Sequence, residues 1–213
     1  MEKASYVSFP PSTLLNPTPV VLVSCAEKDH PENRNLVTVA WAGTVNSDPP
    51  MLSVSLKKER YSHGLILGSG EFVVNLVDEA LSRAADFCGV RSGRDLDKAA
   101  ALGLRYAPAE KMAVAPALDG APAGMNCRVK QVLELGSHDL FLAEIVAGWV
   151  RGDLVDEKGS LHLEKAGLLA YNHGLYQQLG DVTGFFGWSV AREEVRLRRM
   201  APYETRRTDK KER

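Results

Sequence analysis

Apolar and polar residues alternate most regularly between positions 51 and 56. In an extended chain, Leu52, Val54 and Leu56 would face one side, and Ser53 and Ser55 the other. This period of two is typical of a β-strand with one buried face. Other apolar and β-branched runs, bounded by turn residues, predict further strands. The predicted strands are Val20–Ala26, Leu36–Val45 as a central strand, Met51–Leu56, Glu71–Val77, Met125–Leu135 and Leu140–Val150.

Short helical segments interrupt these strands. We expect helices at Glu59–Ser69, at Leu81–Phe87 and from a cap at Asp95 to Leu102. Strands and helices do not alternate regularly, which argues against a doubly wound parallel sheet. The sequence therefore predicts a mainly β protein, with small α insertions, whose antiparallel sheet closes wholly or partly into a barrel.

The two ends of the chain differ from its middle. Four prolines in residues 1–19 predict an extended N-terminal arm, and residues 201–213 form a charged tail that we expect to be solvated and disordered. Residues 20–200 would then form one domain, because 213 residues are enough for one substantial hydrophobic core.

Composition removes several classes of function. The net charge of −1 provides no field for nucleic acid or an anionic membrane. No apolar run reaches the length of about 20 residues that a membrane helix needs, and we expect no signal peptide because an acid at Glu2 and several prolines occupy the N-terminus.

Cysteine and histidine spacing excludes a further class. Cys25, Cys88 and Cys127 are odd in number and form no CxxC pair, so we expect no disulfide framework and no zinc ribbon. No HxH or HExxH motif is present, and a metal centre is not predicted. Free thiols fit a cytoplasmic location. Cys88, beside a glycine-rich loop, is the one cysteine to test for reactivity.

One short stretch after the Met51–Leu56 strand could bind an anion. Ser53 and Ser55 form a hydroxyl-bearing face, and Arg60 and Ser62 follow at the start of a predicted helix. Helix N-termini favour anions, and an arginine with a hydroxyl would complete a phosphate site. The alternative is that this face is simply partly solvated.

Three more residues have both a structural and a functional interpretation. Trp41 is either a core residue or part of a binding site. The small residues Thr38 and Ala40 lie on the opposite face of the predicted strand, where a ring could lie close to the backbone. Asn75, polar in an apolar strand, would contact either a turn or the edge of a ring. His138 is either a turn histidine paired with Asp139 or a contact at the mouth of a site.

Several motifs occur in an order that resembles the FMN-binding split-barrel family of flavin reductase-like proteins, and within it the flavoredoxin-like branch. The resemblance covers about residues 24–190. Its pieces are Asn35-x-x-Thr38-x-Ala-Trp41, Pro49-Pro50 before the Ser53/Ser55 strand, Arg60-Tyr-Ser-His63, Glu71-Phe-Val-Val-Asn-Leu76, Ser137-His-Asp139 before Phe141-x-x-Glu144, Gly-x-Tyr176-x-x-Leu179-Gly180 and Phe186-Gly-Trp-Ser189.

The resemblance implies a six-stranded antiparallel Greek-key split barrel, a homodimer, and FMN near the subunit interface. It assigns FMN binding to Thr38, Val39, Ala40, Trp41, Ser53, Val54, Ser55, Arg60, Ser62, His63 and Asn75. His138 corresponds to a nicotinamide contact, but here the acid follows the histidine, a departure that also marks the flavoredoxin-like branch.

Two functions therefore remain open. One is an NAD(P)H:flavin reductase that uses NADH or NADPH, and the other is an FMN electron carrier reduced by a partner protein without NAD(P)H activity. Neither requires a catalytic acid or base from the chain, because the flavin itself accepts the hydride.

Overall fold

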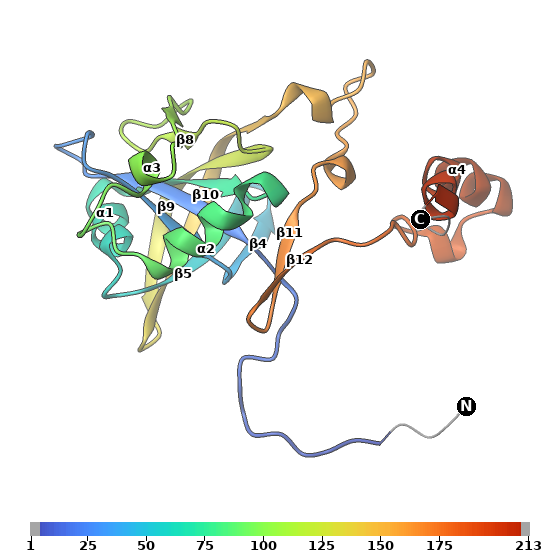
Figure 1. The fold of residues 1–213 in the computed structure, drawn as a ribbon, viewed down its shortest axis with the longest axis horizontal. Coiled ribbons are helices and arrows are strands. Elements are labelled where there is room, and N and C mark those ends of the chain that lie inside the picture. The colour runs from blue at the N-terminus through green and yellow to red at the C-terminus, as the bar shows by residue number, and fades with distance from the viewer. Residues whose placement is uncertain (1–4, 210–213) are drawn as a thin grey trace.

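The computed structural model describes the backbone of residues 5–209 and the side chains of residues 5–203 (Figure 1). Its strands are β1 (Thr18–Pro19), β2 (Val21–Ala26), β3 (Arg34–Val39), β4 (Ala42–Ser47), β5 (Pro50–Lys57), β6 (Glu71–Leu76), β7 (Tyr106–Ala107), β8 (Ala117–Leu118), β9 (Ala123–Glu134), β10 (His138–Val150), β11 (Leu169–Asn172) and β12 (Leu175–Gln178). The α-helices are α1 (Tyr61–Ser69), α2 (Ser82–Val90), α3 (Lys98–Ala101) and α4 (Glu193–Asp209).

Seven strands form one antiparallel sheet in the order β3-β2-β6-β9-β10-β5-β4. The two edge strands, β3 and β4, are consecutive in the chain and are joined by Ala40 and Trp41 alone. So short a link requires the sheet to curl until its edges meet. The Ser55 N–H donates to the Trp41 carbonyl over 2.9 Å at this junction. The antiparallel split-barrel prediction is confirmed: β3 and β4 do not pair with each other along their length, so the barrel has an open seam between them, and Ala40–Trp41 connects them across it.

The prediction of a single central strand over Leu36–Val45 is wrong. The segment contains two strands, β3 and β4, which lie at opposite edges of the sheet. Barrel closure explains the break, because the chain must leave one edge and enter the other within two residues. The main sheet has seven strands rather than six for the same reason.

The barrel interior holds the main hydrophobic core. Val54, Phe72 and Phe141 are completely buried there, together with Ile66 from α1. A second core lies outside β2 and β3, where α2, α3 and Leu169 of β11 cover them. The strict alternation predicted for residues 51–56 is confirmed in β5, where Leu52, Val54 and Leu56 are buried and the intervening residues are half-exposed.

The helix predictions hold except for one cap. α1 ends at Ser69, and Gly70 closes it with a φ of 73°, a conformation that suits glycine. α3 begins after Asp97, whose carboxylate accepts from the Ala100 N–H over 3.1 Å. The predicted cap at Asp95 is wrong, because the Asp95 N–H bonds back to the Ser92 carbonyl in a preceding turn.

Both ends of the described chain extend from the barrel. β1 joins the end of the N-terminal arm to β11, with Thr18 opposite Tyr171. α4 lies apart from the sheet (Figure 1) and runs from residue 193 into the stretch expected to be a disordered tail. Glu193 and Glu194 in its first turn favour a helix start. Residues 210–213 of that tail lie outside the described residues, and the predicted domain boundaries stay a prediction.

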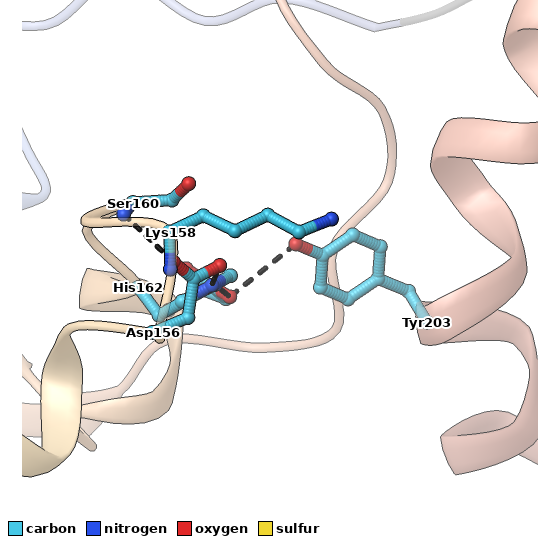
Figure 2. Close-up of polar contacts among 6 residues, drawn as sticks. Asp156, Lys158, Ser160, His162 and Tyr203 are labelled. Carbon is cyan, nitrogen blue, oxygen red and sulfur yellow. Dashed lines mark hydrogen bonds and ion pairs between the residues drawn. The ribbon is translucent and has the colours of Figure 1, made fainter.

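A polar contact joins α4 to the loop after β10. The Tyr203 hydroxyl donates to Glu164 Oε1 over 3.3 Å. His162 Nε2 lies 3.2 Å from Asp156 Oδ2 (Figure 2), and its Nδ1 lies 2.9 Å from Glu164 Oε1.

Among residues 5–209, none of the helices has the length and hydropathy of a membrane span. Among residues 5–203, whose side chains the structure describes, no group of three or more His, Cys, Asp or Glu side chains is placed to hold a metal ion.

Candidate functional site

A pocket of about 640 Å³, the main pocket, lies at the open seam of the barrel. Its volume is that of a small-molecule site. The ends of β3 and β5, the first residue of β10, the N-terminal arm and the β11–β12 hairpin form its walls. The lining residues are Thr13, Asn16, Val37, Thr38, Val39, Ala40, Trp41, Ser55, Leu56, Lys57, Arg60, His138, Tyr171, His173 and Gly174.

Many residues predicted from the sequence converge in this pocket. They are Thr38, Val39, Ala40, Trp41, Ser55, Arg60 and His138. The Thr38 hydroxyl donates to the Ala85 carbonyl of α2, which ties this wall to the helix behind it. Residues far apart in sequence thus form one continuous surface.

The arm and the hairpin form a wall that sequence reasoning missed. The His173 N–H donates to Asn16 Oδ1 over 3.3 Å, and this bond holds the arm against the hairpin above the pocket. Tyr171 reaches the pocket because β11 pairs with β1. No local motif signals these positions, since only long-range strand pairing brings them together.

A smaller pocket of about 290 Å³, the cationic pocket, adjoins the main pocket and shares Val37, Lys57 and Arg60 with it. Its wall also contains Arg91, Lys98, Ser62, Ser92 and Gly93, and Glu59 is its acidic residue. α1 begins at Tyr61 in the same wall. Several cations beside a helix N-terminus favour a phosphate here.

Lys98 is the residue of this pocket that the sequence did not reveal. Its Nζ donates to the Leu36 carbonyl over 2.7 Å and to the Cys88 carbonyl over 3.0 Å, and the side chain is buried. Burial lowers the pKa of the Lys98 ammonium, and the nearby Arg60 lowers it further. A bound anion would offset that cost. A lysine in a helical segment is ordinarily solvated, so only the meeting of β3 and α2 identifies it.

Trp41 and His138 both line the main pocket, and their rings are in contact. Their ring centroids lie 4.6 Å apart with an angle of 44° between the planes. Ser137 Oγ lies 2.9 Å from His138 Nδ1 and fixes the imidazole. Burial lowers the pKa of His138, and the positive charges of Lys57 and Arg60 act in the same direction. Glu59 opposes this shift, but the net effect favours the neutral imidazole.

We expect FMN binding to raise the pKa of His138. Burial depresses this pKa most, and a phosphate dianion between Lys57 and Arg60 would offset the positive charge that depresses it further. Because the pKa would be higher in the complex, FMN binding would be accompanied by proton uptake at His138 at pH values between the pKa of the free protein and that of the complex. An NMR titration of the ring with and without FMN measures this, and His138→Gln identifies the signal. Riboflavin, which lacks the phosphate but would bury the imidazole further, should not raise the pKa of His138; a pKa that falls with FMN would contradict the phosphate placement.

Five other predicted residues, the four below and Asn75, do not line the main pocket. Ser53 lies in an adjoining groove of about 410 Å³ that shares Ala40, Trp41 and Ser55 with the main pocket. Ser62 lines the cationic pocket, and its Oγ accepts from Asn35 Nδ2 over 2.8 Å. Val54 points into the barrel core. His63 is buried against Asp139, with 2.8 Å between Nε2 and Oδ2.

Asn75 does not make the contact with a ring edge that the resemblance implies, because its amide is already bonded within the protein. Its Nδ2 donates to the Leu22 carbonyl and to Ser24 Oγ over 2.8 and 3.0 Å, and its Oδ1 accepts from the Leu118 N–H over 2.8 Å. The side chain is fully buried and lines neither pocket. Asn75 therefore anchors β8 to the sheet, the structural alternative left open by the sequence.

Cys88 is expected to be unreactive in the folded protein. Its side chain is fully buried, and burial raises the pKa of the thiol to about 11, so the nucleophilic thiolate is scarce at neutral pH. A disulfide-exchange reagent should leave Cys88 unmodified at pH 7 and should label all three cysteines after unfolding in urea. Rapid labelling of Cys88 without urea would show that α2 opens.

The fold and the two pockets by themselves define a class of protein. A curled antiparallel sheet carries an uncharged wall at its seam and a cationic pocket next to it, a combination that suits a flat ligand with an anionic end. This is the class of small split-barrel cofactor-binding proteins.

The comparisons identify the family within that class. Residues 14–180 match the model of the flavin reductase like domain, and the chain belongs to that family. Flavoredoxin of Desulfovibrio vulgaris (Miyazaki F) is similar in structure, with a TM-score of 0.78 and 29% identity over 85% of this chain and 97% of that one. For flavoredoxin from Methanosarcina acetivorans the values are 0.79 and 26%, over 88% and 100% of the two chains.

The chain is also similar in sequence to an enzyme. The NADPH-flavin oxidoreductase of Streptomyces viridifaciens is 29% identical over 153 residues, which are 68% of this chain and 74% of that protein. The matches to the first curated relatives span 61% and 64% of those proteins' own length.

Proposed function

We propose that this chain binds FMN and works as an oxidoreductase of the NAD(P)H:flavin reductase type. The observation that carries the proposal is that Arg60 and Lys57 belong to both pockets. They join an uncharged wall, suited to a ring system, to a cluster of cations suited to a phosphate. Family membership supports a flavin as the ligand.

The two pockets would bind different parts of FMN. Lys57, Arg60 and Lys98 would neutralise the phosphate, and the backbone from Val39 to Trp41 would lie along the ring system. Bound FMN supplies the capacity to accept and donate a hydride or electrons, and the chain supplies binding, orientation and electrostatics.

NADH or NADPH is the proposed electron donor. Similarity to an NADPH-flavin oxidoreductase supports a nicotinamide donor. His138, which lines the main pocket with its ring tilted against Trp41, is the proposed contact for the nicotinamide. A neutral imidazole can donate or accept one hydrogen bond per nitrogen and would suit a carboxamide.

The second candidate is an FMN electron carrier that a partner protein reduces. Its support is the structural similarity to two flavoredoxins over almost their full length. In that case the exposed surface around Trp41 would receive the partner, and nicotinamide would not bleach the flavin.

We also propose a homodimer and a cytoplasmic location. Large apolar side chains are exposed on both extensions from the barrel: Tyr6, Val7, Phe9, Leu14 and Leu15 on the arm, and Phe186, Trp188, Val190 and Leu197 after residue 180. A second copy of the chain would cover them. The three free, buried cysteines suit a reducing compartment.

An anaerobic visible spectrum of the FMN-loaded protein tests the proposal. We expect bound flavin to bleach within seconds of adding NADH or NADPH. Bound flavin that stays oxidised would select the carrier, and failure to bind FMN would reject both functions. Sedimentation of the loaded protein would test the dimer in the same preparation.

A further inference from the structure

A buried polar cluster lies behind the proposed FMN site without lining it. His63 Nε2 lies 2.8 Å from Asp139 Oδ2, and Lys58 Nζ lies 3.4 Å from Asp139 Oδ1. The side chains of His63 and Asp139 are 10% and 7% exposed, and neither residue lines the main or the cationic pocket. The edge of the His63 ring packs on Phe141 of the barrel core. We call Lys58, His63 and Asp139 the clasp.

Each member of the clasp is the sequence neighbour of a pocket residue. Lys58 follows Lys57, His63 follows Ser62, and Asp139 follows His138. The clasp thereby ties three elements that are separate in the chain: the end of β5, the first turn of α1 and the start of β10. The cationic pocket depends on the first turn of α1, and the main pocket depends on the start of β10.

The charges of the clasp make this tie strong. Burial alone would raise the pKa of the Asp139 carboxyl, but the hydrogen bond with His63 and the positive charge of Lys58, whose Nζ lies 3.4 Å from Oδ1, outweigh burial and hold this pKa below its usual range. Asp139 is therefore an ionised, buried carboxylate. Hydrogen bonds to ionised groups are shorter and stronger than neutral ones, so α1 and β10 have little freedom to shift against each other.

We infer that His63 and Asp139 are positioning residues that set the spacing between the phosphate end and the ring end of the FMN site. This inference rests on the proposed function. A ligand that carries both a phosphate and a ring system gains affinity from both only if the two parts of the site are held at the correct separation. A ligand that uses the ring end alone does not need that separation.

FMN and riboflavin are the probes that separate these two cases, because riboflavin lacks the phosphate. We would titrate both into the wild type and into His63→Leu, His63→Gln and Asp139→Asn, following the quenching of flavin fluorescence. In His63→Leu and Asp139→Asn we expect the preference for FMN over riboflavin to fall about tenfold, with riboflavin affinity unchanged. Gln can still donate to Asp139, so His63→Gln should recover most of the preference.

His162 provides a matched control, because it pairs with Asp156 and Glu164 in the loop near α4 (Figure 2). His162→Leu removes a similar histidine–carboxylate pair and should leave the preference for FMN intact. Circular dichroism and thermal melting establish that each variant is folded. Should His63→Leu not fold, Asp139→Asn and the half-exposed Lys58→Met give the same measurement.

The outcomes separate the two proposals. Wild-type protein that binds neither flavin would reject the proposed function and the clasp together. Wild-type protein that prefers FMN, with an unchanged preference in His63→Leu and Asp139→Asn, would reject the clasp alone. Equal losses for FMN and riboflavin would show a general loss of structure and would also overturn the positioning role.

Discussion

Arg60→Ala is expected to weaken FMN binding by about 1–3 kcal/mol, or roughly 5- to 150-fold in Kd. Arg60 lines both pockets and is half-buried between them. Its guanidinium can make two parallel, charge-assisted bonds to a phosphate. A titration that follows the quenching of FMN fluorescence measures the loss.

Two comparisons make the Arg60 result specific. Riboflavin should bind Arg60→Ala and the wild type equally, since it has no phosphate to lose. Arg105→Ala removes another arginine, one that is exposed and pairs with Asp119, and should change neither affinity. Unchanged FMN affinity in Arg60→Ala would contradict the placement of the FMN phosphate at Arg60, even though the chain belongs to a flavin-binding family.

Local pattern predicted the strands where burial is one-sided. Leu52, Val54 and Leu56 face the barrel core, so the period of two was visible in the sequence. The apolar run over Leu36–Val45 carried no such signal for its break at Ala40–Trp41. That break is set by the closure of the sheet, a property of all seven strands together.

The candidate site was predictable only in part. Trp41, Arg60 and His138 were singled out by residue type and by resemblance, and the structure brings them into one pocket. Lys98 and Tyr171 were missed, because their places depend on pairings over long sequence distances, between β3 and α2 and between β1 and β11.

Polar residues inside apolar strands were the least reliable guide to function. Asn75 in β6 was expected to contact a ring, yet its amide holds the Leu118 N–H and the Leu22 carbonyl. A buried amide must be satisfied, but the backbone of neighbouring strands satisfies it as well as a cofactor does. Glu71, at the other end of the same strand, follows the same rule and can be tested directly.

We expect Glu71→Ala to lower the free energy of unfolding by about 2–4 kcal/mol. The Glu71 side chain lies under the loop before β8. Its Oε1 accepts from the Val114 and Ala115 N–H groups over 2.5 and 2.8 Å, and its Oε2 accepts from the Ala113 N–H over 3.1 Å. Removing the carboxylate leaves these donors without a partner, and the buried Ala115 N–H is the most costly of them. Urea unfolding measures the loss as a lower midpoint at constant slope.

Glu71→Gln is the matched variant, because its amide oxygen can still accept from Val114 and Ala115 while its NH₂ group cannot accept from Ala113. It should lose less stability than Glu71→Ala. Amide hydrogen exchange should accelerate at residues 113–115 in both variants and remain slow in β5. FMN affinity should not change, because Glu71 lines neither the main nor the cationic pocket. A Glu71→Ala protein with wild-type stability would show that the three bonds add nothing to the fold, and a loss of FMN affinity at unchanged stability would move Glu71 into the site.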